Sequence, residues 1–175
     1  IAVDLLDRIT KVTDHNGMVV QYAYDAAGNQ ISIGYPDCSQ VDYWYDAENH
    51  VTQVQDFTGD ATTYTYDANG NVVGTTDPLG NTETSSYDSM NQAVSTTDKR
   101  GNTTHTTYDT MGRVTSVTDA EGHTTSYTYD ANTDRMLSVT SGNSTVFYAY
   151  DTYGTLQNIT SAGGTAVSYT HLRAH

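Results

Sequence analysis

The aspartates of this chain are the residues whose type and spacing could support chemistry. Of the 21 acidic residues, 13 are aspartates that recur in two columns with a period of 21 residues, and most are followed by glycine three positions later. Rows of carboxylates could bind calcium, as they do in other repeat proteins. Those proteins use nine-residue periods with paired glycines, which this chain lacks, so we favour aspartates that cap tight turns.

Other side chains with catalytic potential lack the partners that catalysis requires. His15, His50, His105 and His123 fall in four different columns of the repeat and share no metal-ligand spacing, so we expect structural or solvated roles for them. Cys38, the sole cysteine, has no adjacent histidine motif, and no Gly-x-Ser-x-Gly sequence marks a nucleophilic serine. We therefore predict no catalytic, metal-binding or cofactor-binding residue, no cofactor, and a protein that is not an enzyme.

The dipeptide Tyr-Asp recurs every 21 residues without insertion or deletion. Its tyrosines are Tyr24, Tyr45, Tyr66, Tyr87, Tyr108, Tyr129 and Tyr150. An eighth unit that lacks the tyrosine begins at Val3-Asp4, because residues 4–14 align with residues 109–119 without a gap. Self-similarity at a fixed spacing of this length indicates a repeat architecture.

Each repeat contains two predicted turns. One begins at the aspartate of Tyr-Asp and the other at an aspartate ten residues later, and the fourth turn residue is usually glycine, which tolerates a left-handed backbone. An aspartate followed by such a residue is typical of a type I turn that closes a β-hairpin. The structural turn residues that we single out are Asp25, Gly28, Asp67, Gly70, Asp77, Gly80, Asp98, Gly101, Asp109, Gly112, Asp119, Gly122, Asp151 and Gly154.

The segments between the turns are rich in threonine, valine, isoleucine and tyrosine, which predicts short strands. On the strand before each Tyr-Asp turn, a second tyrosine two residues earlier points to the same face of the pleat. These structural aromatic residues are Tyr22, Tyr24, Tyr43, Tyr45, Tyr64, Tyr66, Tyr127, Tyr129, Tyr148 and Tyr150. On the other strand, apolar residues three apart, such as Val51 and Val54, require either a β-bulge or burial on both faces.

One unit of 21 residues is too small to fold alone, so neighbouring units must extend a common sheet. We predict an all-β fold: a repetitive antiparallel β-hairpin sheet, forming a spiral or shell segment built from 21-residue repeats. Residues 1–170 contain about eight such units. Residues 171–175 leave the register, and because the ending SYTHLRAH resembles translated adapter sequence, we expect them not to be native.

Charge and hydropathy exclude two classes of partner. The formal net charge is −14 with only seven lysines and arginines, so the chain has no basic track for nucleic acid. The sequence contains no apolar run long enough to span a membrane and no signal peptide, although it begins in the middle of the pattern. Most of the negative charge belongs to the turn aspartates.

The complete pattern resembles the YD repeat of the Rhs family, whose relatives include wall-associated proteins, insecticidal toxin-complex shell subunits and teneurins. In this pattern, Tyr-Asp-x-x-Gly-[Asn/Arg] is followed by β-branched residues, a second Asp-x-x-Gly and a Tyr-x-Tyr-Asp return. Residues 108–129 (YDTMGRVTSVTDAEGHTTSYTY) match it best, and Arg113 supplies the Gly-Arg pair that the family prefers. Other units depart from it at Asn29, Cys38, Asn71 and Thr133.

The resemblance implies a β-sheet spiral that winds into a hollow shell. We expect a non-catalytic structural scaffold, a wall segment of the encapsulating β-shell of a secreted or surface-delivered bacterial Rhs-type polymorphic toxin. Its partners would be further repeats of the same polypeptide and an enclosed C-terminal toxin domain. The alternative is a cell-surface or wall-associated adhesion module that binds carbohydrate or another cell. Either interpretation predicts a secreted or cell-surface location.

Overall fold

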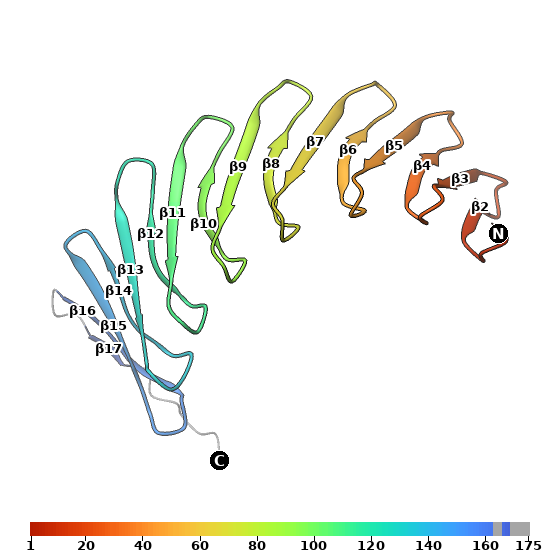
Figure 1. Cartoon of the computed structure of the whole chain (residues 1–175). Helices are drawn as coiled ribbons and strands as arrows, with labels where there is room; N and C mark the ends of the chain where they lie inside the picture. Colours follow the sequence, from red (N-terminus) through yellow and green to blue (C-terminus); the bar gives the residue numbers. More distant parts are fainter. Residues whose placement is uncertain (163–165, 169–175) are drawn as a thin grey trace, which may run out of the picture. The chain divides into compact units, whose positions relative to one another are not determined.

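The computed structural model describes residues 1–162 and 166–168, and this part of the chain contains strands and turns but no helix (Figure 1). The off-register segment 171–175 lies outside the described residues. The chain divides into two compact units, residues 1–84 and 85–175. The prediction of an all-β, repetitive hairpin fold is confirmed.

The first unit is built from consecutive antiparallel strands. Each strand pairs with the next one along the chain, so every connection is a hairpin (Figure 1). β9 (Thr82–Tyr87) crosses the boundary between the units. The other strands of this unit are β1 (Ala2–Val3), β2 (Ile9–Thr13), β3 (Val19–Tyr24), β4 (Gln30–Gly34), β5 (Gln40–Tyr45), β6 (Val51–Gln55), β7 (Ala61–Tyr66) and β8 (Val72–Thr76).

The second unit repeats the same connection. Its strands after β9 also pair antiparallel in chain order. They are β10 (Ala93–Thr97), β11 (Thr103–Tyr108), β12 (Val114–Thr118), β13 (Thr124–Tyr129), β14 (Met136–Ser141), β15 (Ser144–Tyr150), β16 (Leu156–Ser161) and β17 (Ala166–Ser168).

A β-bulge occurs in six hairpins that are closed by a Tyr-Asp turn: β3–β4, β5–β6, β7–β8, β11–β12, β13–β14 and β15–β16. In β5 and β6, Tyr43 lies opposite Val54 and Tyr45 opposite Val51, so Thr52 is the extra residue. Residues directly opposite each other share a face of the sheet, and the bulge therefore brings both valines to the face of the tyrosines. The bulge, rather than burial on both faces, accounts for the spacing of three between the apolar residues.

Among the described residues no apolar side chain is fully buried, and Ser138 is the only buried residue. The two tyrosines of each Tyr-x-Tyr segment are half-buried, and the residue between them is more exposed, as in β7 (Ala61–Tyr66). Each unit is therefore a sheet without an enclosed core. Contacts between successive repeats must supply stability that a core would otherwise give.

Candidate functional site

The turns that follow the Tyr-Asp tyrosines share one hydrogen-bond pattern, except the turn at Asp130. In the turn that begins at Asp67, the amide of Gly70 donates to the carbonyl of Asp67 at 3.1 Å, and the amide of Asp67 donates to the carbonyl of Asn71 at 3.0 Å. The carboxylate oxygen Oδ1 of Asp67 accepts the amides of Asn69 and Asn71, both at 2.9 Å. With Gly70 at a φ of 84°, this is a type I turn followed by a left-handed residue.

The second turn of the repeat has the same backbone. Asp98 Oδ1, for example, accepts the amides of Arg100 and Asn102 at 2.8 and 2.9 Å. Every aspartate that we singled out begins such a turn. The glycines that we singled out have positive φ values, and they are Gly28, Gly70, Gly80, Gly101, Gly112, Gly122 and Gly154.

The turn carboxylates are already engaged by their own turns, which bears on whether they could bind calcium. Hydrogen bonds from the side chain and the amide of Asn71 lower the pKa of Asp67. The same two groups of Asn102 lower the pKa of Asp98. One oxygen of each of these two carboxylates caps the backbone and the other accepts a side-chain hydrogen bond, so capping accounts for the aspartates at these two positions.

The side chain four residues after the aspartate of a Tyr-Asp turn links one repeat to the next. Arg113 donates from Nε to Asp109 Oδ2 at 2.7 Å within its own turn. Its Nη1 donates to the carbonyls of Asp130 and Thr133 at 3.0 and 2.6 Å in the following turn. Its guanidinium lies 4.7 Å from the ring centroid of Tyr129, a cation–π distance. We call this arrangement the repeat junction.

The first unit contains an equivalent junction at Arg8. Its Nε donates to Asp4 Oδ2 at 2.7 Å and its Nη1 donates to the carbonyl of Asp25 at 3.2 Å. Its guanidinium lies 4.7 Å from the ring centroid of Tyr24. Two arginines 105 residues apart in the sequence thus make the same contacts.

Residues other than arginine also form junctions at this position. Asn29 donates to Asn49 Oδ1 in the next turn at 2.7 Å. The ring of His50 stacks on Tyr66 of the next repeat, with 4.7 Å between centroids. Gln92 donates to the carbonyl of Gly112 at 3.2 Å. Asn29 departs from the preferred Gly-Arg pair, yet it still reaches the following repeat.

The Tyr-Asp tyrosine adds a second link, which runs backwards along the chain. The hydroxyl of Tyr66 donates to the carbonyl of Val51 at 2.7 Å, and that of Tyr129 donates to the carbonyl of Val114 at 2.9 Å. Partial burial raises the pKa of both hydroxyls. The same bond, to the carbonyl 15 residues earlier, is made by Tyr24, Tyr45 and Tyr108. The tyrosines two positions earlier, Tyr22, Tyr43, Tyr64, Tyr127 and Tyr148, are half-buried on the same face.

One repeat keeps its junction by a shift of a single residue. The amide of Asp130 donates to the carbonyl of Arg135, five residues later, so this turn is one residue longer than the others. Thr133 stands where other turns have glycine and donates to Asp130 Oδ1 at 3.1 Å. The guanidinium of Arg135 lies 5.9 Å from the ring centroid of Tyr150. The arginine missing from its usual column is therefore present one position later.

The first unit has two open hollows on its surface. One has a volume of about 630 Å³, and its lining includes Asp46, Glu48, His50, Tyr66 and Asp67. The other is smaller and is lined in part by Tyr22, Tyr35 and the exposed Cys38, whose φ is 67°. Cys38 takes the left-handed position that glycine fills in most turns.

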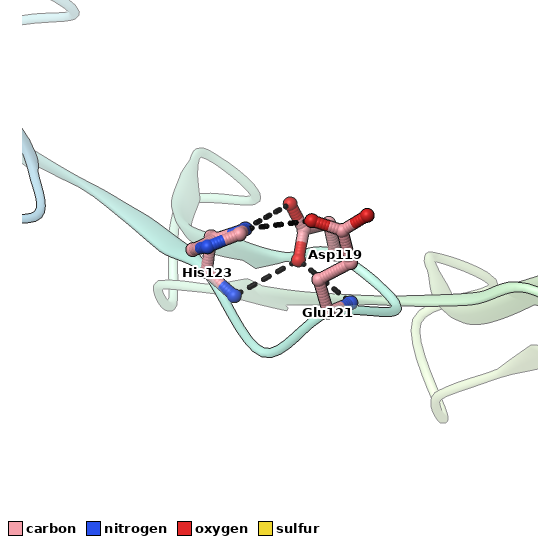
Figure 2. A group of neighbouring side chains, drawn as sticks. All are labelled: Asp119, Glu121 and His123. Carbon is pink, nitrogen blue, oxygen red and sulfur yellow. Dashed lines mark hydrogen bonds and ion pairs between the residues drawn. The ribbon is translucent and has the colours of Figure 1, made fainter.

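The four histidines lie in different columns of the repeat, but His50 and His123 have similar neighbours in the sequence. Each lies four residues after a turn aspartate and two after a glutamate, although the two turns belong to different columns. Figure 2 shows Asp119, Glu121 and His123 pointing toward one another, and their ligand atoms lie within 4.8 Å of one another. Comparing only the columns of the repeat does not reveal this shared spacing within the two turns.

These features define a class of protein: a β-repeat array in which successive hairpin units are linked by turn side chains and by tyrosine hydroxyls. The model of the RHS repeat family matches residues 4–37, 45–82, 87–124 and 108–146. These matches cover more than half of the chain, and the protein belongs to this family. Within the described residues no helix is long and apolar enough to cross a membrane.

Solved structures share the fold. The crystal structure of TcdB2-TccC3-TEV superposes with a TM-score of 0.59 and 15% identity, over 97% of this chain and 12% of that one. The crystal structure of TcdB2-TccC3 without hypervariable C-terminal region gives 0.54 and 15%, over 91% of this chain and 11% of that one. The chain thus spans about an eighth of the length of these neighbours. The curated proteins contain no match.

Proposed function

We propose that the chain is a non-catalytic structural scaffold, a wall segment of the encapsulating β-shell of a secreted or surface-delivered bacterial Rhs-type polymorphic toxin. The observation that carries this proposal is the repeat junction, which recurs in both units and joins one Tyr-Asp turn to the next, as at Arg8, Asn29 and Arg113. Membership of the RHS repeat family and the shared fold with the TcdB2-TccC3 structures support it.

The physical argument is that a shell wall must be stiff without being thick. The described residues enclose no apolar core, so stability comes from neighbour contacts that can be repeated for as many units as the wall needs. The partners are then further repeats of the same polypeptide and a C-terminal toxin domain inside the shell. The negative charge keeps a threonine-rich sheet surface in solution and discourages association between shells.

The test is protease protection of whatever follows the repeats in the full-length protein. The complete gene is sequenced, and the downstream domain is produced both within the full-length protein and alone. An enclosing shell predicts that the domain resists digestion in the full-length protein and is digested readily when alone. Equal digestion of the two forms, or a wall anchor in place of a downstream domain, would overturn the proposal. Binding of the purified chain to a glycan array would instead support the adhesion module.

A further inference from the structure

We propose that the turn of residues 119–123 binds a divalent transition-metal ion of the zinc or nickel type, with Asp119, Glu121 and His123 as its protein ligands (Figure 2). No other group of three such residues gathers its ligand atoms in this way within the part of the chain that the structure describes. The site belongs to the surface of the second unit and is independent of the shell function.

The distances between the ligand atoms suit such an ion. His123 Nδ1 lies 3.1 Å from Asp119 Oδ2 and 3.5 Å from Glu121 Oε2. Zinc–nitrogen and zinc–oxygen bonds are about 2.0–2.2 Å, so ligand atoms around one ion stand roughly 2.9–3.5 Å apart in tetrahedral or octahedral geometry. The two spacings from His123 Nδ1 therefore fall in or at the edge of the range that a bound ion requires, and the ligand oxygens of Asp119 and Glu121 lie within 4.8 Å of each other.

The turn itself holds the first ligand in place. Asp119 Oδ1 accepts the amides of Glu121 and His123 at 3.0 and 2.8 Å, which leaves Oδ2 directed at the imidazole ring. Gly122 has a φ of 84°, which lets the chain reverse so that the three side chains project on one side, as Figure 2 shows. The turn is therefore ordered before any ion binds, so ion binding does not bear the entropic cost of ordering the backbone.

The histidine decides which class of ion is expected. Calcium and magnesium prefer sites made only of oxygen, whereas an imidazole nitrogen beside carboxylates suits zinc, nickel or copper. The side chains of Asp119, Glu121 and His123 are 50%, 80% and 72% exposed, so water can complete the coordination shell. A nitrogen ligand that faces two carboxylates distinguishes this turn from an ordinary acidic surface.

Another turn of the chain has the same backbone but lacks the glutamate and the histidine of this site. The turn that begins at Asp98 has the same backbone, but it has Arg100 in the place of the glutamate and Asn102 in the place of the histidine. Asn102 donates to Asp98 Oδ2 at 2.9 Å, so asparagine satisfies the turn carboxylate as histidine does. His123→Asn is therefore a change that removes a ligand and preserves the turn.

The experiment is a titration of the whole 175-residue chain with Zn²⁺ at pH 7.5 by isothermal calorimetry, after treatment with chelator. We expect His123→Asn to weaken binding by about tenfold or more, while the control His15→Asn, in another turn, leaves it unchanged. The reciprocal variant Arg100→Glu with Asn102→His should add a second site to the chain. Circular dichroism shows that the compared variants have the same fold.

Two results would overturn the proposal. The first is Zn²⁺ binding that is unchanged in His123→Asn, since the ion would then be held elsewhere. The second is binding of Ca²⁺ as tight as that of Zn²⁺, with equal retention of both in His123→Asn, which would indicate a general acidic surface. No binding of Zn²⁺ by the original chain would equally refute it.

Discussion

Two turns of this chain have nearly the same sequence and make different contacts. Residues 46–50 read Asp-Ala-Glu-Asn-His and residues 119–123 read Asp-Ala-Glu-Gly-His, and in both the aspartate carboxylate caps the turn. His50 stacks on Tyr66 of the next repeat, whereas His123 faces Glu121 of its own turn. The place of a turn in the repeat, rather than its motif, determines whether its side chains join repeats or face solvent.

The comparison extends to other turns of both columns. In a Tyr-Asp turn, the side chain four residues after the aspartate can reach the next repeat. At Arg8 and Arg113 it contacts a tyrosine ring and a turn carbonyl of that repeat. In three turns of the other column, the residues at the corresponding position hydrogen-bond through their side chains to the aspartate of their own turn, and they are Asn81, Asn102 and His123. Only the first kind of turn should therefore contribute to stability beyond its own hairpin.

The largest expected effect is that of Arg113→Ala. It removes the Asp109 ion pair, two hydrogen bonds to the next turn and the contact with Tyr129, so we expect the free energy of unfolding to fall by about 2 kcal/mol. Denaturant unfolding of the original chain and the variant measures this change in the free energy of unfolding. Arg100→Ala, in a turn of the other column, is the matched control, and equal losses for the two variants would contradict the comparison.

A smaller difference is expected between glycines of the two kinds of turn. Gly112 and Gly122 have φ values of 81° and 84°, so valine is strained at either by roughly 1–2 kcal/mol. A Cβ at Gly112 would also lie 2.9 Å from Gln92 Nε2, whereas at Gly122 it would meet nothing within 4 Å. We expect Gly112→Val to lower the melting temperature more than Gly122→Val does.

Ser116→Val is the strand control for these glycines, because Ser116 lies in β12 (Val114–Thr118). We expect it to cost less than Gly112→Val, since valine suits a strand and no left-handed backbone is involved. A melting temperature lowered equally by both variants would contradict the role assigned to the turn.

His50→Asn and His123→Asn test the comparison between the turns of residues 46–50 and 119–123 directly. The first variant loses the ring contact with Tyr66, and we expect a destabilisation of about 0.5–1 kcal/mol. The second should leave unfolding unchanged in the absence of metal, because asparagine serves in the equivalent turn at Asn102. Thermal melting of the two variants under metal-free conditions measures the difference, and a reversed order would refute the distinction between the turns.

The smallest difference between the two kinds of turn is expected in how low pH affects their stability. The pKa of Asp67 and that of Asp98 are lowered from 3.8 by hydrogen bonds from Asn71 and Asn102 respectively. As the pH falls, the unfolded chain is protonated first, so this stabilisation is complete above pH 3.8 and is lost as the pH falls through the lowered folded value. Asp67→Asn and Asp98→Asn should each reduce, by the same amount, the decrease in melting temperature that occurs as the pH falls. A clearly unequal effect would show that the two turn kinds also differ in their caps.

The sequence was sufficient to predict the hairpins because their determinants are local. An aspartate and a left-handed residue within four positions define each turn, and β-branched residues define the strands between them. The bulge at Thr52 was one of two possibilities, and only the register of β5 and β6 decides between them. Local chemistry thus gave the elements but left part of their pairing open.

The junctions could not be predicted because they depend on how one repeat lies against the next. Arg113 reaches carbonyls 17 and 20 residues away, and nothing near Arg113 in the sequence identifies these partners. The column alignment even concealed Arg135, since its longer turn moves it one position. The same alignment separated His50 from His123, because it compared columns of the repeat and not places within a turn.

The tyrosine hydroxyl binds a carbonyl 15 residues back, and the junction side chain reaches only the following turn. Both of these bonds end on backbone carbonyls, which every repeat has. A genetic duplication or loss of one 21-residue block would therefore leave bonds of this kind with a suitable acceptor. Recombination between repeats can in this way change the length of such a protein in whole steps without new residues being selected at the joins.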